Sequence, residues 1–125
     1  MAEAPAVTEL ARSAERRQLT VMFCDLVDST PLATRLDPED TADVYRGFRD
    51  LCAATIEAAG GFVAKWMGDG VMAYFGYPTA HEDAAERAVH AALALVQAAG
   101  ELGDGSDGRL AARIGIATGP VIVGD

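Results

Sequence analysis

The chain has 125 residues, 50% of them hydrophobic, which is enough for one domain with a substantial core and too little for two. Its formal net charge is −9 at pH 7. Binding to a nucleic acid requires a basic face that neutralises phosphates, so the acidic balance excludes a nucleic-acid partner. An anionic substrate is therefore expected to bind together with metal ions.

The sequence predicts a cytoplasmic protein without a membrane partner. Residues 1–5 lack a cationic region followed by an apolar run, and no apolar stretch reaches the length that spans a bilayer. The cysteines Cys24 and Cys52 form neither a disulfide framework nor a metal-ligand spacing. Both are expected to be buried free thiols.

The first half of the chain predicts a strand followed by two helices. Residues 1–17 lack strong apolar periodicity and are interpreted as a lead-in, which leaves residues 18–125 as the domain. Residues 19–24 form a nearly continuous apolar run, typical of a strand buried on both faces. Capping residues followed by proline then predict a short helix ending at Leu36 and a longer one ending at about Ala59.

The middle of the chain predicts a β-hairpin. Residues 62–67 and 71–75 are strand-like runs that flank Gly68 and Gly70. The tip of this hairpin carries Asp69.

The last third predicts a helix and further strands. A capping-box pattern at residues 79–82 opens a third helix that is expected to stop at Gly100. Residues 110–118 predict a fourth strand, and Gly119-Pro120 is expected to separate it from a final apolar run at 121–123. The order strand, two helices, hairpin, helix, strand (βααββαβ) favours an α+β fold with a ferredoxin-like sheet covered by helices.

Two carboxylates lie at the ends of predicted strands. Asp25 ends the first apolar run, and a charge in such a place needs a partner. Asp69 taken alone is most simply a turn residue. If the first strand lies beside the hairpin, both side chains reach one point, where hard oxygen ligands suit Mg²⁺ or Mn²⁺.

Two further features have both a structural and a functional interpretation. Asp28, Ser29 and Thr30 either cap the helix that follows or present its N-terminus to a phosphate. Regular alternation places Lys65 on the same face of its strand as Val63. There its ammonium either extends to the edge of the sheet or meets a ligand.

Three blocks that occur in order resemble the class III adenylyl and guanylyl cyclase family: residues 23–30, 60–70 and 113–120. The resemblance covers residues 18–125, and three shorter segments are similar to bacterial members related to soluble adenylyl cyclase: residues 15–21, 76–78 and 81–83. It implies the nucleotidyl cyclase fold and the conversion of ATP to 3′,5′-cyclic AMP and pyrophosphate.

The resemblance also implies roles for individual residues. Asp25 and Asp69 would hold two ions of Mg²⁺ or Mn²⁺ per site, with the backbone carbonyl of Leu26 as a further ligand. Phosphate oxygens would be held by backbone groups of Val27, Asp28, Ser29 and Thr30. Lys65 matches the family's base-reading lysine, which donates to N1 of adenine, whereas guanylyl cyclases usually place an acid there.

Family members work as pairs of catalytic domains packed head to tail, which implies that the chain forms a homodimer with shared sites. Their pattern continues beyond Asp125 with an asparagine, an arginine and a second base-reading residue. The chain is therefore expected to be truncated on its C-terminal side and to lack a complete active site. The alternatives are a guanylyl cyclase and a catalytically incomplete domain that dimerises or binds nucleotide.

Two other enzyme classes fit less well. Receiver domains also place an acid at a strand end, but they need alternating βαβ units, and the predicted hairpin argues against them. Diguanylate cyclases have a related fold, but their signature hairpin has two glycines and adjacent acids where this chain has Gly68-Asp69-Gly70.

Overall fold

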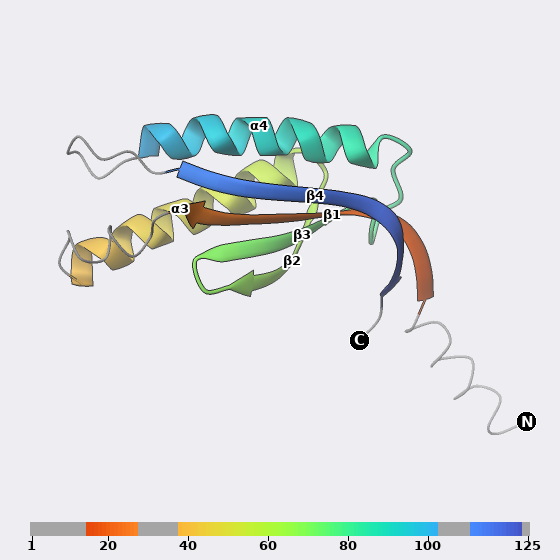
Figure 1. Cartoon of the computed structure of the whole chain (residues 1–125), viewed down its shortest axis with the longest axis horizontal. Coiled ribbons are helices and arrows are strands. Elements are labelled where there is room, and N and C mark those ends of the chain that lie inside the picture. The colour runs from red at the N-terminus through yellow and green to blue at the C-terminus, as the bar shows by residue number, and fades with distance from the viewer. Residues whose placement is uncertain (1–14, 28–37, 103–110, 124–125) are drawn as a thin grey trace, which may run out of the picture.

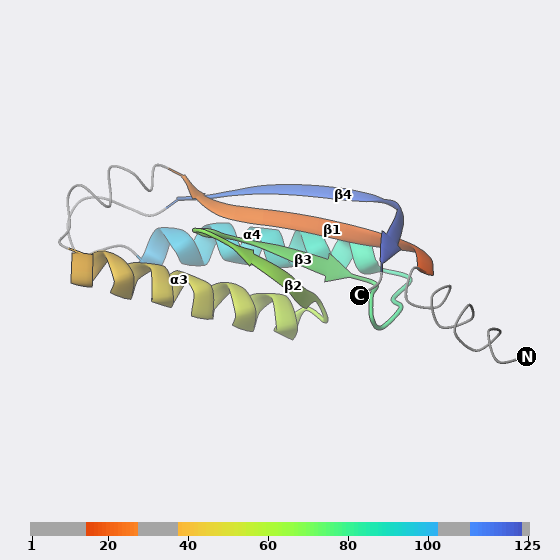
Figure 2. The ribbon, with the colours of Figure 1, turned by 90° about the horizontal axis from the view of Figure 1, so that it is seen from below.

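The computed structural model describes residues 15–27, 38–102 and 111–123. In this part of the chain one antiparallel sheet of four strands, in the order β2-β3-β1-β4, carries both helices on one face (Figures 1 and 2). The elements in chain order are β1 (Glu15–Val27), α3 (Pro38–Ala58), β2 (Phe62–Met67), β3 (Gly70–Phe75), α4 (Ala84–Leu102) and β4 (Ala111–Val123). The expected α+β fold is confirmed.

The central strand β1 pairs with a neighbour on each side. It pairs with β3 from Thr20 to Asp25 and with β4 along its whole length. It begins at Glu15, three residues before the expected start of the domain at Gln18. The buried hydroxyl of Thr20 is satisfied by a 2.8 Å hydrogen bond with the hydroxyl of Thr118 on β4.

The hydrophobic core lies between the sheet and the two helices. Spacings of two residues on the strands and of three or four on the helices bring apolar side chains to this one layer. Burying a side chain as large as Phe48 or Leu95 contributes about 1.5–3 kcal/mol. The core residues are Met22, Cys24 and Leu26 of β1, Phe48, Cys52 and Ile56 of α3, Val71, Ala73 and Phe75 of β3, and Ala84, Ala88, Ala91, Leu95 and Ala99 of α4.

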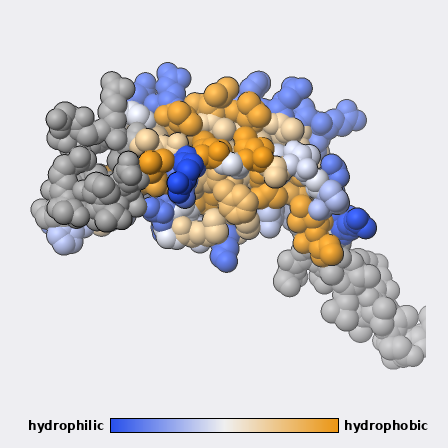
Figure 3. Space-filling view, viewed as in Figure 1, coloured by the Kyte–Doolittle hydropathy of each residue, from blue (hydrophilic) through white to orange (hydrophobic). Residues whose placement is uncertain are grey.

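The opposite face of the sheet, called the open face below, carries no helix of the described residues (Figure 2). Apolar residues cover much of it, as Figure 3 shows in the view of Figure 1. Phe23 and Phe62 stay 47% and 44% exposed. The ring centroid of Tyr74 lies 6.3 Å from that of Phe62 in a stacked arrangement and 6.0 Å from that of Tyr77 in an edge-on one.

Three expected boundaries are wrong. Helix α4 begins after Asp83, whose carbonyl accepts the N–H of Arg87 at 3.0 Å, so the capping-box pattern at residues 79–82 precedes the helix instead of opening it. The helix also continues through Gly100. Strand β4 runs unbroken through Gly119-Pro120, because it is an outermost strand of the described sheet and such a strand tolerates proline. The short helix expected to end at Leu36 lies outside the described residues.

The packing around two glycines gives a paired prediction on stability. A Cβ atom at Gly61 would lie 2.6 Å from a ring carbon of Phe75 and 2.8 Å from Cγ2 of Ile56, both in the core. Gly61→Ala is therefore expected to lower the free energy of unfolding by about 1–3 kcal/mol. Gly100→Ala is the matched control, because a Cβ there meets no atom within 4 Å and alanine favours a helix by about 0.5–1 kcal/mol.

Urea denaturation of both variants measures these effects. Equal destabilisation by the two substitutions would contradict the packing described around Gly61.

Candidate active site

The sheet register brings the two predicted acidic residues to one end of the sheet. Asp25 on β1 stands directly opposite Gly70, the first residue of β3. Asp69 precedes Gly70 in the turn between β2 and β3. Residues opposite each other on antiparallel strands have Cα atoms about 4.5–5.5 Å apart, and Asp69 directly adjoins Gly70, the partner of Asp25. The condition that the first strand lies beside the hairpin is met.

Gly70 allows β3 to approach Asp25 this closely. A Cβ at Gly70 would lie 2.8 Å from the carbonyl oxygen of Cys24 and 2.9 Å from the Cβ of Asp25. Any larger residue would push the turn with Asp69 away from β1, so a glycine is needed for a steric reason as well as for the turn. Sequence reasoning recognised only the turn.

Asp25 has a cationic partner that sequence reasoning did not assign. Arg113 on β4 lies opposite Asp25, and its guanidinium donates two hydrogen bonds to the Asp25 carboxylate. Nε donates to Oδ1 at 3.3 Å and Nη2 donates to Oδ2 at 3.2 Å. The Arg113 and Asp25 side chains are 72% and 40% exposed. Ion pairs this exposed contribute about 0.2–1 kcal/mol, so a metal ion can displace the arginine. The signal in the sequence that could have identified Arg113 is its charge within the apolar run at 110–118.

Lys65 lies on the opposite face of the sheet from Val63. Val63 pairs with Ala73, but Lys65 pairs with Met72, so Ala64 is an extra residue that forms a β-bulge. Because the bulge interrupts the alternation, Lys65 shares the open face with its partner Met72, while Val63 shares the core face with Ala73. The expectation that Lys65 and Val63 share a face is wrong for this reason.

Of the other residues predicted to contact phosphate or metal, Leu26 and Val27 are the last two of β1. The side chain of Leu26 is buried in the core, so only its backbone is available to a ligand. Val27 is the last residue of β1 and is partly buried. Asp28, Ser29 and Thr30 lie outside the described residues.

The donors available to a metal ion are few. Among the described residues, no group of three or more His, Cys, Asp or Glu side chains could hold a metal. The candidate set is therefore Asp25, Asp69 and nearby backbone oxygens. Its chemistry fits Mg²⁺ or Mn²⁺, which take oxygen ligands and keep several of their waters.

The two cysteine thiols near this site form a hydrogen bond with each other. Cys24, next to Asp25 on β1, and Cys52 on α3 are buried and free, as expected. A hydrogen bond with the thiol of Cys24, together with burial, raises the pKa of the Cys52 thiol. Cys52 is therefore protonated at neutral pH and acts as a small core residue.

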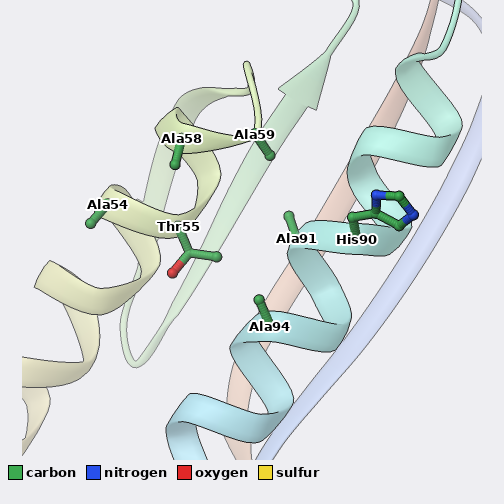
Figure 4. A pocket seen from close by; sticks show the side chains of 7 residues that line it. All are labelled: Ala54, Thr55, Ala58, Ala59, His90, Ala91 and Ala94. Carbon is green, nitrogen blue, oxygen red and sulfur yellow. The ribbon is translucent and has the colours of Figure 1, made fainter.

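A cleft of about 410 Å³ lies away from the acids, between α3 and α4 (Figure 4). It contains none of the predicted site residues, and most of its lining is methyl groups. The lining residues are Ala54, Thr55, Ala58 and Ala59 of α3 and His90, Ala91 and Ala94 of α4.

Neither helix in the described residues is long and apolar enough to cross a membrane.

Comparison with known proteins identifies relatives over most of the chain. The adenylate cyclase of Anabaena cylindrica is 31% identical over 123 residues, which cover 90% of this chain and 23% of that protein. Adenylate cyclase 1 of Rhizobium meliloti (strain 1021) is 29% identical over 117 residues, covering 90% and 18%. The chain thus spans less than a quarter of the length of these relatives.

Solved structures agree with the sequence relatives. The guanylyl cyclase Cya2 superposes with a TM-score of 0.81 at 33% identity, over 90% of this chain and 59% of that one. The adenylyl cyclase CyaB from P. aeruginosa superposes with a TM-score of 0.82 at 30% identity, over 88% and 60%. The family described as adenylate and guanylate cyclase catalytic domain matches residues 11–125. The chain therefore belongs to the adenylate and guanylate cyclase catalytic domain family.

Proposed function

We propose that the protein carrying this domain is an adenylyl cyclase that converts ATP to 3′,5′-cyclic AMP and pyrophosphate for intracellular signalling. The observation that carries the proposal is the β1–β3 register, which sets Asp25 beside the turn that bears Asp69. In the reaction the 3′-oxygen of the ribose bonds to the α-phosphorus, the bond from that phosphorus to the bridging oxygen breaks, and the hydroxyl proton passes to solvent.

Asp25 and Asp69 are proposed to hold two ions of Mg²⁺ or Mn²⁺ together with the carbonyl of Leu26. When bound, such ions lower the pKa of an attacking hydroxyl and stabilise the charge on a leaving pyrophosphate. Asp25 and Asp69 orient the reactants through these ions, and Gly70 keeps the two acids close. The backbone from Val27 onward is proposed to hold phosphate oxygens.

Lys65 is proposed to select adenine. Its ammonium only donates hydrogen bonds, and N1 of adenine only accepts them, whereas N1 of guanine carries a proton. Lys65 is exposed on the open face, where a base can reach it. A second candidate is a guanylyl cyclase, which the 33% identity to Cya2 favours.

The open face is proposed to pack head to tail against a second copy of the domain. Phe23 and Phe62 give this face exposed aromatic groups, and aromatic groups are enriched in the cores of interfaces. Lys65 lies on the same face and is then placed to serve the site of the partner. The apolar face that no described helix covers supports this arrangement.

Loss of either acid is expected to abolish catalysis and leave the fold intact. Asp25→Ala and Asp69→Ala should each lower cyclic AMP formation by the full-length protein by about 10²-fold or more, the scale of losing one preorganised group that stabilises charge. Asp43→Ala is the control, because Asp43 is exposed on α3 and pairs with Arg46 on the same helix. Near-normal turnover by either site variant would refute the metal assignment.

The choice of base is expected to depend on Lys65, which is the single lysine of the sequence. Lys65→Glu should lower kcat/KM for ATP more than kcat/KM for GTP, because glutamate accepts a hydrogen bond from N1 of guanine and repels N1 of adenine. Measuring kcat/KM for both nucleotides in both proteins tests this. A wild-type preference for GTP would establish the guanylyl cyclase alternative.

Arg113 is expected to compete with metal ions for Asp25. Arg113→Gln should tighten Mn²⁺ binding to the nucleotide-free chain by about 1.4- to 5-fold, because the exposed ion pair that the metal must break is worth about 0.2–1 kcal/mol. Electron paramagnetic resonance of free Mn²⁺ gives the affinity. Weaker binding by Arg113→Gln would mean that the arginine supports the metal site instead of blocking it.

A further inference from the structure

The hairpin tip that carries Asp69 has little packing around it. Strand β2 is an outermost strand of the described sheet, and its last three residues are exposed. Gly68, at the start of the turn, adopts a positive φ of 58°, and a Cβ built there meets no atom within 4 Å. Packing alone therefore leaves the orientation of the turn weakly determined.

One side chain from α3 connects the helix to this tip. Nη2 of Arg49 donates a hydrogen bond to the carbonyl oxygen of Gly68 at 3.0 Å. The guanidinium carbon of Arg49 also lies 5.4 Å from the centre of the Trp66 ring on β2. Trp66 pairs with the buried Val71, so it lies on the face of the sheet that α3 covers. The cation–π contact with Trp66 favours this position of the guanidinium, and the guanidinium in turn holds the carbonyl.

The bonded carbonyl belongs to the peptide group that leads into Asp69. The peptide group is planar, so the oxygen of Gly68 lies in one plane with the nitrogen and Cα of Asp69. Holding that oxygen sets the orientation of the plane from which the Asp69 side chain departs. Arg49 thus acts on Asp69 through the backbone, without touching its carboxylate in any contact described.

We propose that Arg49 is a positioning residue for Asp69: by holding the Gly68 carbonyl against α3, it keeps the Asp69 carboxylate aimed at the metal site beside Asp25. This inference rests on the proposed function, in which Asp69 is a metal ligand. It assigns Arg49 no contact with substrate or metal.

Position and charge predict opposite effects for this arginine. A cation near a metal site repels the metal, so if Arg49 acts only through its charge, replacing it with a neutral residue tightens metal binding. If Arg49 positions Asp69, the same replacement weakens metal binding, because the Asp69 carboxylate loses its fixed direction. The sign of the change therefore separates the two roles.

The test measures the affinity of the nucleotide-free chain for Mn²⁺ alone, by electron paramagnetic resonance. Arg49→Gln is expected to weaken binding about 3- to 10-fold, at or below the low end of the roughly 10- to 100-fold typical of groups that hold a metal ligand in place. Arg46→Gln is the matched control, since it removes the same charge from the same helix and Arg46 pairs with Asp43 at 2.8 Å. It should change the affinity little.

A second variant keeps the test decisive if Arg49→Gln folds poorly. Arg49→Lys still donates to the Gly68 carbonyl, so it is expected to bind Mn²⁺ more tightly than Arg49→Gln. If charge alone mattered, the lysine variant would bind more weakly than the glutamine variant. Amide hydrogen exchange provides the independent readout: Arg49→Gln should speed exchange at Asp69 and Gly70 and leave the core strand β1 unchanged.

Asp69→Asn distinguishes the two ways to fail. If Asp69→Asn leaves Mn²⁺ binding unchanged, the proposed function has lost its metal ligand. If Asp69→Asn weakens binding but Arg49→Gln binds as tightly as Arg46→Gln, or leaves exchange at the hairpin tip unchanged, the positioning role is wrong and the metal assignment stands.

Discussion

The pairing of β1 with a neighbour on each side is the constraint on which the rest of the structure depends. Its alternate residues Met22, Cys24 and Leu26 enter the core, which leaves Phe23 and Asp25 on the open face. A slip of one residue in the pairing would exchange these two sets, burying the carboxylate and exposing the core side chains. The same register that minimises exposed apolar surface therefore delivers Asp25 to Gly70 and to Arg113.

Electrostatics around the site differ from those of the chain as a whole. A net charge of −9 repels a triphosphate at long range, and added salt weakens that repulsion. Near the two acids, however, Arg113 lies on one side and Arg49 on the other. One arginine faces a carboxylate directly, and the other faces a backbone carbonyl. Arg113 of β4 thus neutralises the charge of Asp25, whereas Arg49 of α3 contacts only the backbone next to Asp69.

Local pattern in the sequence predicts the existence of the elements but not the contacts between them. The helix periodicity of residues 38–58 and the glycines around Asp69 determine local structure through residues close in sequence. The helix and the turn can therefore be predicted from the sequence. The pairing of Arg113 with Asp25 joins residues 88 positions apart, and that of Arg49 with Gly68 joins residues 19 apart. Such contacts depend on the register of strands and on where a helix crosses the sheet, which composition does not reveal.

The errors have equally specific causes. Ala64 is small and apolar, so it fits either face of a strand and gives no sign that it is an extra residue. The position of Lys65 was therefore predicted from an alternation that the bulge interrupts. Gly119-Pro120 indicates a break in most strands, but an outermost strand can accommodate it. In the first case the backbone of β2 deviates from regular alternation, and in the second the backbone of β4 stays regular where the sequence indicates a break.

The bulge at Ala64 also bears on how the molecule can associate with others. An outermost strand exposes unpaired N–H and C=O groups along its free side, and a straight strand of this kind readily recruits another chain into one continuous sheet. A bulge bends and twists the strand, so the hydrogen-bonding groups of β2 no longer form an even row. Uncontrolled growth of the sheet through this edge is thereby disfavoured, and contact between flat faces becomes the more accessible route to a closed assembly of finite size.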